Sequence, residues 1–451
     1  MVYDIAVVGS GFSAIAVTIH LLQLLPPTRS IAVIGDDPEF GRGAAYRSEF
    51  HLHRLNVPAA RMSVFPESPD DFVDWLRRRG KNATLNAFAP RSDYGLYLRD
   101  TLAALLRKRD RARLDLIRAK ATACLGRSET GIVFRLDNSD ELTARNVVLC
   151  VGMNNARLPL GSDRVDERAR QSIVDNPWRL GWLSKVKPDE TLCILGSGLT
   201  MIDQVLALRQ HGHRGKIHVL SRRGLLPHAH LSSVPGPVPV QLPEASREIS
   251  HILASLRRQA GAAANWRCVM DGLRPLTRQL WQSLTAEQRA RFLRHALPWW
   301  NIHRHRIPPA ISERFDSLVR DGTVTIQAGL LHSISKENGG VNLHYRPRGR
   351  SDDLALQVNR IINCTGLERA GIDHSPLLRD MRQGGLLRAD TLGFGIDVNA
   401  ASQVLRGNGK PHQDIFAIGA LTAGQFWEIT AVPDIRVQAQ KVAQALMSNS
   451  L

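Results

Sequence analysis

The sequence predicts an α/β protein with two nested Rossmann-like dinucleotide-binding domains, each a three-layer ββα arrangement, and a helical insertion. Three observations predict this fold: a glycine-rich turn near the N-terminus, a second such turn at Gly196, and a Pro-rich and then helical segment after it. The 451 residues are enough for two or three domains with large cores.

The first unit opens the chain. Residues 3–8 form a short, β-branched apolar run typical of a buried parallel strand, residues 13–25 have a helical pattern, and residues 31–34 form a second strand. The apolar run 5–25 also raises the possibility of a signal peptide or membrane span. Glycines 9 and 11 interrupt that run, so we expect no targeting segment, no membrane partner and a cytoplasmic location.

A second β-turn-α-β unit runs from residue 191 to residue 221. Two further apolar strands end in glycine, at 147–152 and 361–366. Another, at 415–419, precedes a closing helix at 436–447. The alternation of strands and helices favours parallel sheets.

The first turn, residues 9–14, has the pattern GxGxxA. Gly9 permits a tight turn, Gly11 lets the backbone approach a diphosphate, and Ala14 lets helix and strand pack closely. The helix N-terminus adds free N–H groups and a positive dipole end. The residues expected to bind the first cofactor, FAD, at this turn are Gly9, Gly11, Phe12, Ser13 and Ala14.

The second strand of such a unit usually ends in an acidic residue that binds the adenosine ribose. Gly35 occupies that position here and is followed by Asp36 and Asp37. We expect Asp36 to bind the ribose from a shifted backbone. The alternative is that both aspartates only form a turn before Pro38.

The second turn, residues 196–201, lacks the third small residue and is a weaker signal. Its support is the segment 221–223, Ser-Arg-Arg, which follows the second strand of the unit. Arginines there favour the 2′-phosphate of NADPH, whereas an acid would favour NADH. The alternative is a basic surface loop. The residues expected to bind NADPH are Gly196, Gly198, Leu199, Thr200, Ser221, Arg222 and Arg223.

Two such turns in one chain indicate hydride transfer from NADPH to a flavin, with the protein placing the two rings. The expected division is an FAD-binding domain at 1–158 plus 360–451, an NADPH-binding domain at 159–224 plus 320–359, and a helical insertion at 225–319.

Seven stretches carry a family resemblance: FGRGAAY at 40–46, LNVPAARMSVFPESPDDFVDWL at 55–76, PRSDYGLYL at 90–98, GSGLTMID at 196–203, LSRRGLLPHAH at 220–230, WWNIHRHRIPP at 299–309 and WEITAVPDIRVQA at 427–439. Together they resemble bacterial FAD/NAD(P)-binding proteins related to the class B flavoprotein monooxygenases, including N-hydroxylating ones. The resemblance covers nearly the whole chain.

The resemblance implies that Arg42, Tyr46, Asn56 and Met62 lie near the flavin and its ribityl chain. It also implies that Gly419 and the following helix approach the isoalloxazine and diphosphate. That last site has Gly-Ala in place of the usual Gly-Asp, so the resemblance does not carry the usual aspartate bond to the ribityl chain over to this sequence. The Baeyer–Villiger fingerprint FxGxxxHxxxW is also missing, which disfavours ketone oxygenation. The other expected cofactor-binding residues are Gly152, Thr365, Gly366 and Trp427.

Residues 299–306 contain two Trp, two His and two Arg, which suit an anionic or planar ligand. We expect Arg304 and Arg306 to clamp a substrate carboxylate; the alternative is that this stretch docks the insertion onto the cofactor domains. Glu428 is expected to donate or accept a proton near the flavin, with a cap or salt bridge for the last helix as the alternative. The residues expected in catalysis are Asn56, His303, Arg304, Arg306 and Glu428.

Composition excludes several other classes. The formal charge is +17, but basic residues are scattered and no nucleic-acid-binding motif is present, so we expect no nucleic-acid partner. Five cysteines contain no CxxC pair, which disfavours zinc ribbons, iron–sulfur sites and a redox-active disulfide, and we expect no metal. The cysteine pattern fits a reducing compartment.

The sequence therefore predicts a single-component FAD-dependent monooxygenase. NADPH would reduce FAD, and O₂ would then form a flavin C4a-(hydro)peroxide that oxygenates a small anionic or amine-bearing substrate, with amino-acid N-hydroxylation favoured. The alternative is an NADPH-dependent flavoprotein reductase or dehydrogenase that passes electrons to another acceptor or to a partner protein recruited by the basic surface. A third class is a non-catalytic NADPH/FAD-binding sensor. The sequence gives no oligomeric state.

Overall fold

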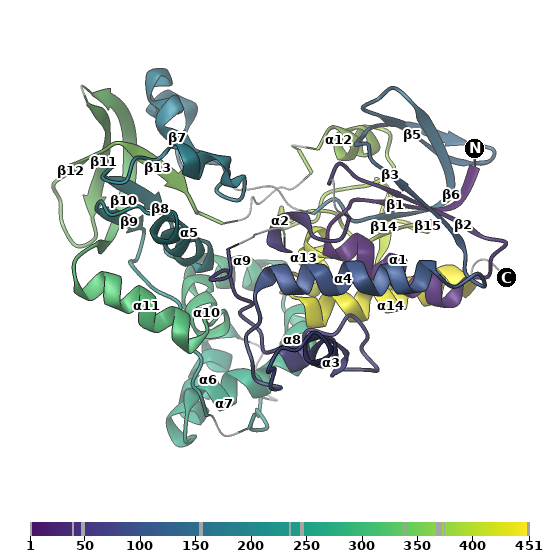
Figure 1. The fold of residues 1–451 in the computed structure, drawn as a ribbon, viewed down its shortest axis with the longest axis horizontal. Coiled ribbons are helices and arrows are strands. Elements are labelled where there is room, and N and C mark those ends of the chain that lie inside the picture. Colours follow the sequence, from purple (N-terminus) through teal and green to yellow (C-terminus); the bar gives the residue numbers. More distant parts are fainter. Residues whose placement is uncertain are drawn as a thin grey trace.

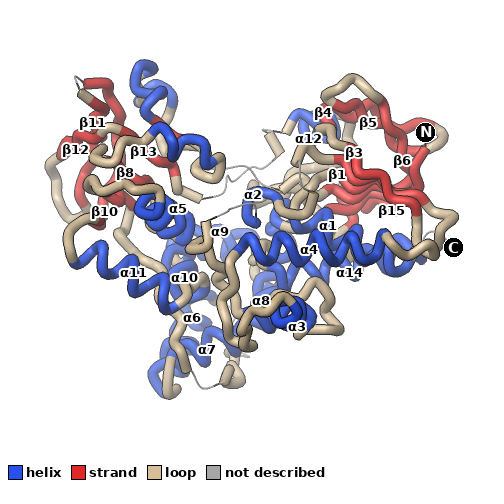
Figure 2. Tube along the Cα trace, in the orientation of Figure 1, coloured by secondary structure: helices blue, strands red, loops and turns tan. Residues whose placement is uncertain are grey.

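The computed structural model describes residues 2–37, 40–46, 50–152, 157–233, 236–243, 248–337, 339–366, 372–373 and 375–448. Two lobes, each built on a sheet, lie at opposite ends of the molecule, and helices fill the space between and below them (Figure 1; Figure 2). Pro38, before which the sequence allowed a turn, lies outside the described residues. The α/β fold expected from the sequence is confirmed.

The first lobe contains a mostly parallel sheet in the order β14-β15-β6-β1-β2-β3. β1 is central, with Val8 opposite Ile34 of β2 and Leu149 of β6. The ribbon β4-β5 extends antiparallel from β6. The strands are β1 (Val2–Val8), β2 (Ser30–Ile34), β3 (Arg113–Ile117), β4 (Ala121–Ser128), β5 (Gly131–Leu136), β6 (Glu141–Leu149), β14 (Gln403–Leu405) and β15 (Pro411–Ala417).

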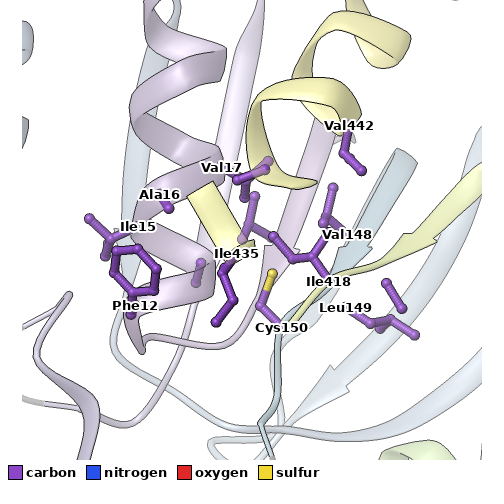
Figure 3. Close-up of a cluster of buried hydrophobic side chains, with 14 of the residues drawn as sticks. Phe12, Ile15, Ala16, Val17, Val148, Leu149, Cys150, Ile418, Ile435 and Val442 are labelled. Carbon is purple, nitrogen blue, oxygen red and sulfur yellow. The ribbon is translucent and has the colours of Figure 1, made fainter. Parts of the chain in front are cut away.

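Helices from both ends of the chain cover this sheet. Helix α1 is buried on nearly every side because it packs between the sheet, α4 and α14. Figure 3 shows Phe12, Ile15 and Val17 of α1 in one cluster with Ile435 and Val442 of α14. The helices are α1 (Phe12–Leu24), α2 (Gly43–Tyr46), α3 (Asp71–Arg78), α4 (Arg91–Leu106), α12 (Pro376–Gln383), α13 (Ala423–Phe426) and α14 (Val432–Ser448).

The second lobe contains the sheet β12-β11-β10-β9-β8-β13-β7, in which β10 to β7 are parallel and β11 and β12 are antiparallel. The strands are β7 (Ile173–Val174), β8 (Leu192–Leu195), β9 (Ile217–Ser221), β10 (Val324–Glu337), β11 (Gly340–Pro347), β12 (Leu354–Val358) and β13 (Arg360–Asn363). Its covering helices are α5 (Leu199–Gln210) and α11 (Pro309–Arg320).

Two expected boundaries are corrected. Strand β13 was assigned by sequence to the first domain, beginning at residue 360, yet it pairs with β8 in the second sheet. The error arises because a glycine-ended apolar strand looks the same in either sheet. Helix α11 falls inside the expected insertion 225–319, but Ile311 and Phe315 pack in the second lobe's core.

The insertion itself is helical, as expected, and packs against the first lobe. Trp281, Leu284 and Leu293 belong to the hydrophobic core of the first sheet. The helices are α6 (Ile249–Ala262), α7 (Trp266–Leu273), α8 (Thr277–Ser283), α9 (Ala286–His295) and α10 (Leu297–Arg304). Short 3₁₀ turns are η1 (Ala59–Arg61), η2 (Ser162–Arg164), η3 (Glu167–Ser172), η4 (Leu180–Lys185), η5 (Arg274–Leu276) and η6 (Ala420–Thr422).

Among the residues that the structure describes, no helix combines the length and apolar character needed to cross a membrane.

Candidate functional site

The first glycine turn is a tight backbone cradle at the carboxyl end of β1. Gly9 has φ +132°, and an added Cβ there would lie 2.3 Å from the Cys150 carbonyl oxygen. Gly11 begins α1 with φ −83°, and an added Cβ would approach nothing closer than the Gly43 Cα at 4.0 Å. No side chain caps α1, so its first N–H groups face the turn.

The second glycine turn has the same construction. Gly196 has φ +98°, and an added Cβ would lie 2.4 Å from the Cys364 carbonyl oxygen. Gly198 begins α5 with φ −88°, and an added Cβ would have no atom within 4 Å. Again no side chain caps the helix. Both turns therefore fit a diphosphate, since each leaves backbone room and N–H donors at a helix start.

The two acidic residues after β2 differ in burial. Asp37 is buried, and its Oδ2 accepts a hydrogen bond of 2.9 Å from the Gly43 N–H. Asp36 is exposed at the end of the strand. Gly35 packs directly on Ser10, where a Cβ would lie 2.4 Å from the Ser10 Cβ. Asp37 thus has a structural contact, which leaves Asp36 as the acid that remains accessible to a ribose.

The basic segment after β9 lies beside the second turn. Ser197 Oγ donates 2.7 Å to the Leu225 carbonyl and contacts Ser221 Oγ at 2.9 Å, which fixes the loop. Arg222 is exposed and Arg223 half-buried. Within the described ranges, neither guanidinium has a hydrogen bond or ion pair. Both remain available to an anion beside the turn.

Aromatic residues gather over the first turn. The rings of Tyr46 and Tyr94 lie 4.8 Å apart, and Phe12 lies 5.9 Å from Tyr94. Tyr94 is fully buried, and its hydroxyl has no hydrogen-bond partner among the described residues. Burial raises the pKa of Tyr46 to about 12 and also raises the pKa of Tyr94 well above its usual value. A buried polar atom without a partner is costly, and a polar group of a bound cofactor would satisfy it.

Gly419 lies against the start of α1. It has φ +79°, and an added Cβ would lie 2.4 Å from Ser13 Oγ. Its N–H donates 2.9 Å to Gln438 Oε1. Gln438 Nε2 in turn donates to Ser402 Oγ and Thr422 Oγ1, so this glycine is fixed by a buried hydrogen-bond network.

Other expected cofactor residues occupy nearby loops. Gly152 and Gly366 follow equivalent strands and have φ +71° and +109°. Thr365 donates 2.7 Å through its hydroxyl to Asn363 Oδ1. Met62 is buried at the end of η1. Arg42 passes over α4, where a Cβ on Gly95 would lie 3.0 Å from Arg42 Cγ.

Asn56 lies where the two lobes and the insertion meet. It lines a small cavity together with Leu199 at the start of α5 and Ile307. Its carbonyl pairs with His230 Nε2 at 3.0 Å. The lobes are joined here by an ion pair of 2.8 Å between Arg91 Nη2 and Asp203 Oδ2, both nearly buried.

Glu428 joins the insertion to the segment before α14. Its Oε1 accepts a hydrogen bond of 2.7 Å from Trp300 Nε1, and its Oε2 accepts one of 3.0 Å from Arg304 Nε. Trp427 stacks on Trp281, with ring centroids 4.3 Å apart. Trp427 and Glu428 both have positive φ, +47° and +31°, which is strained for side-chain-bearing residues. Glu428 therefore forms its salt bridge with Arg304 of α10 in the insertion, whereas the alternative considered from the sequence was a cap or salt bridge for the last helix.

The expected clamp of Arg304 and Arg306 is wrong in this geometry. Arg306 is buried and forms an ion pair with Asp271 of α7, whereas Arg304 turns to Glu428. The reason is that α10 ends at Arg304, so Arg306 lies beyond the helix and its side chain takes a different direction. The His303 ring meets the Trp266 ring edge to face, with 4.8 Å between the ring centroids.

Sequence reasoning missed three contributors. Tyr94 has a buried hydroxyl without a hydrogen-bond partner in the described residues, and no sequence pattern indicates this. His230 lies beside Asn56, and burial followed by the Arg306 charge lowers its pKa to about 4. The Arg91–Asp203 pair crosses between lobes, which spacing alone does not reveal. No group of three or more His, Cys, Asp or Glu side chains in the described part of the chain could hold a metal.

Comparison with known proteins identifies a family domain in part of the chain. Residues 6–154 match the family model described as FAD-NAD(P)-binding. No curated protein sequence matches the chain at the significance required.

Solved structures share the whole fold. The ornithine N-hydroxylase of Kutzneria sp. 744 is 13% identical, with each chain fully covered and a TM-score of 0.68. The ornithine hydroxylase of Pseudomonas aeruginosa, in its reduced form, is 16% identical, with full coverage of both chains and a TM-score of 0.67. The L-lysine 6-monooxygenase of Pseudomonas syringae is 17% identical over 98% of this chain and 99% of that chain, with a TM-score of 0.67. This chain thus contains an FAD-NAD(P)-binding family domain and has the overall fold of the N-hydroxylating flavoprotein monooxygenases.

Proposed function

We propose that this chain is an FAD-dependent, NADPH-using monooxygenase that oxygenates a small organic molecule. The observation that carries the proposal is the pair of equivalent glycine cradles, at Gly9 and Gly196, each backed by a cysteine carbonyl of the neighbouring strand. The shared fold with ornithine and lysine hydroxylases supports the reaction class.

The first lobe fits FAD. The diphosphate would sit on the N-terminus of α1 at Gly11, with Asp36 toward the adenosine ribose. Tyr46 and Tyr94 would stand near the flavin portion, where the unsatisfied Tyr94 hydroxyl gains a partner. The flavin, once bound and reduced, supplies the oxygen chemistry.

The second lobe fits NADPH. The diphosphate would sit on the N-terminus of α5 at Gly198. Arg222 and Arg223, which have no acidic partner in the described residues, would bind the 2′-phosphate through charge-assisted hydrogen bonds.

The chain's own groups position and shield the reaction. Asn56 and Leu199 come from different lobes and meet at one cavity, so the junction can bring the two redox rings together. His230 is neutral at pH 7 because its pKa is about 4, so it adds no charge beside Asn56. The Arg91–Asp203 ion pair holds the lobes in this relation and helps to exclude water.

The substrate is an amine-bearing or anionic small molecule, with amino-acid N-hydroxylation as the favoured variant. An amine nitrogen is a suitable nucleophile for oxygen transfer, and two of the structural neighbours are ornithine hydroxylases. The five cysteines contain no CxxC pair, and four of them are buried, so disulfide reduction does not fit.

Stopped-flow spectroscopy tests the proposal. The FAD-loaded protein is reduced with NADPH without oxygen and then mixed with oxygenated buffer. A lasting near-ultraviolet band of a flavin–oxygen adduct supports the monooxygenase. Immediate return of oxidised flavin supports instead the reductase, and failure of NADPH to bleach the flavin would overturn both.

A further inference from the structure

A cavity lies away from the lobe junction, between α14, α8 and the loop at residues 400–402. Its volume is about 340 Å³, within the range of small-ligand pockets. Figure 1 shows α8 of the insertion next to α13 and α14. None of the residues expected to clamp a substrate reaches it except Arg304.

The cavity combines an apolar interior with cations at its rim. Phe426, Trp427, Ile429 and Val437 give apolar walls. The charged lining residues are Arg274, Arg278, Arg304, Lys441, Glu428 and Asp434.

Two of the four cations are already neutralised. Arg304 Nε bonds Glu428 at 3.0 Å, and Arg274 Nη2 bonds Asp434 at 3.2 Å. The exposed Arg278 and Lys441 have no acidic partner among the described residues, and Arg278 instead lies 4.3 Å from the Phe426 ring centroid. An anion at the rim would therefore meet two uncompensated positive charges.

Backbone strain collects at the same place. Among the described residues, four that carry side chains have positive φ, and three of them, Ser402, Trp427 and Glu428, line this cavity. Such conformations cost free energy and persist mainly at binding and active sites. The cavity floor also includes Gln438, which accepts the hydrogen bond from the Gly419 N–H.

We propose that this cavity binds an amphipathic organic anion, that is, a small molecule in which one carboxylate group is attached to an apolar portion. The carboxylate would lie between Arg278 and Lys441, and the apolar body would lie on Phe426 and Trp427. The inference rests on the cavity alone and does not require the proposed reaction.

Isothermal titration of the FAD-loaded protein with butanoate, octanoate and dodecanoate tests the proposal. At least one should bind at one site, and octylammonium, of matched length to octanoate and opposite charge, should not. The double variant Arg278→Ala/Lys441→Ala should weaken carboxylate binding about tenfold or more. The control variant Arg258→Ala/Lys410→Ala removes the same charge from exposed positions outside the cavity lining, and it should leave carboxylate binding unchanged.

A second variant tests the location without removing charge. Ala400→Trp fills the cavity from an exposed loop position and should also weaken binding. NADPH oxidation with and without the carboxylate then separates a substrate, which is consumed, from a regulator, which is not; either result supports the site. Absence of binding by all three carboxylates, equal binding of octylammonium, or full binding in both variants would overturn the proposal.

Discussion

The alanine substitutions Gly11→Ala and Gly198→Ala separate folding from nucleotide binding. Both glycines have negative φ, −83° and −88°, which alanine adopts without strain. An added Cβ meets no atom closer than 4.0 Å at Gly11 and none within 4 Å at Gly198. Alanine is a poorer N-cap residue than glycine, which destabilises the fold, but it also lowers the conformational entropy of the unfolded chain, which stabilises the fold. Each effect is about 1 kcal/mol or less, and the two oppose each other. The free energy of unfolding should therefore change by about 1 kcal/mol at most.

Nucleotide binding should respond much more strongly. If a diphosphate packs on these glycines, the new methyl group displaces it from the helix N-terminus. Losing one charge-assisted hydrogen bond costs about 1.5–3 kcal/mol, which is roughly 10- to 150-fold in affinity. Gly198→Ala should raise the KM for NADPH by this factor with normal FAD content, and Gly11→Ala should lower FAD affinity.

The assays are flavin absorbance after purification, titration with added FAD, and NADPH-dependent flavin bleaching. Gly196→Ala is the contrasting variant, since its Cβ would lie 2.4 Å from the Cys364 oxygen at φ +98°. It should destabilise the fold, lowering Tm by about 2–4 °C per kcal/mol lost. Wild-type binding of both nucleotides in Gly11→Ala and Gly198→Ala would refute the placement of diphosphates at these turns.

Three further predictions concern charge. Arg222→Ala combined with Arg223→Ala should weaken NADPH by about 1–3 kcal/mol and hardly affect NADH, as measured by initial rates; equal losses would remove both from the 2′-phosphate site. Glu428→Gln should lower the free energy of unfolding in urea by about 1–3 kcal/mol because the nearly buried Arg304 loses its acid; an unchanged midpoint would contradict this. The pKa of His230 falls from 6.5 to about 4 on folding. The neutral imidazole therefore makes its full contribution to the free energy of unfolding above pH 6.5, and that contribution is lost as the pH falls toward 4. His230→Gln should therefore show a shallower loss of stability over that window in pH-dependent melting, and an identical slope would argue against it.

The strands, the two turns and the insertion could be predicted because local pattern determines them. Gly9 and Gly196 stand between an apolar strand and a helix, and positive φ at that point needs glycine. Long-range pairing could not be predicted in the same way. Strand β13 has the same apolar, glycine-ended pattern as β6, yet it joins the other sheet.

The sequence also does not determine the direction in which individual side chains point. Arg304 and Arg306 are two positions apart. In a continuing helix their side chains would point in different directions, whereas in an extended strand they would lie on the same face. The helix ends between them, so one meets Glu428 and the other Asp271. Tyr94 likewise gives no sequence signal of an unsatisfied hydroxyl, because that depends on what packs around it.

The two glycine turns have the same backbone construction, but other segments cover the first turn more than the second. This difference predicts how readily each nucleotide dissociates. At the first turn Gly419 packs on Ser13 and Gly43 faces Gly11, so other segments close over the start of α1. At the second turn a Cβ added to Gly198 would have no atom within 4 Å, and the neighbouring Arg222 is exposed.

Release from an enclosed site requires those covering segments to open, whereas an open site exchanges freely. The first nucleotide should therefore stay bound through gel filtration and turnover, while the second should dissociate and be replaced in each cycle. Flavin absorbance and fluorescence of the protein fraction measure the first, and equilibrium dialysis with NADP⁺ measures the second. Retention of NADP⁺ with loss of flavin would reverse the assignment of the two lobes.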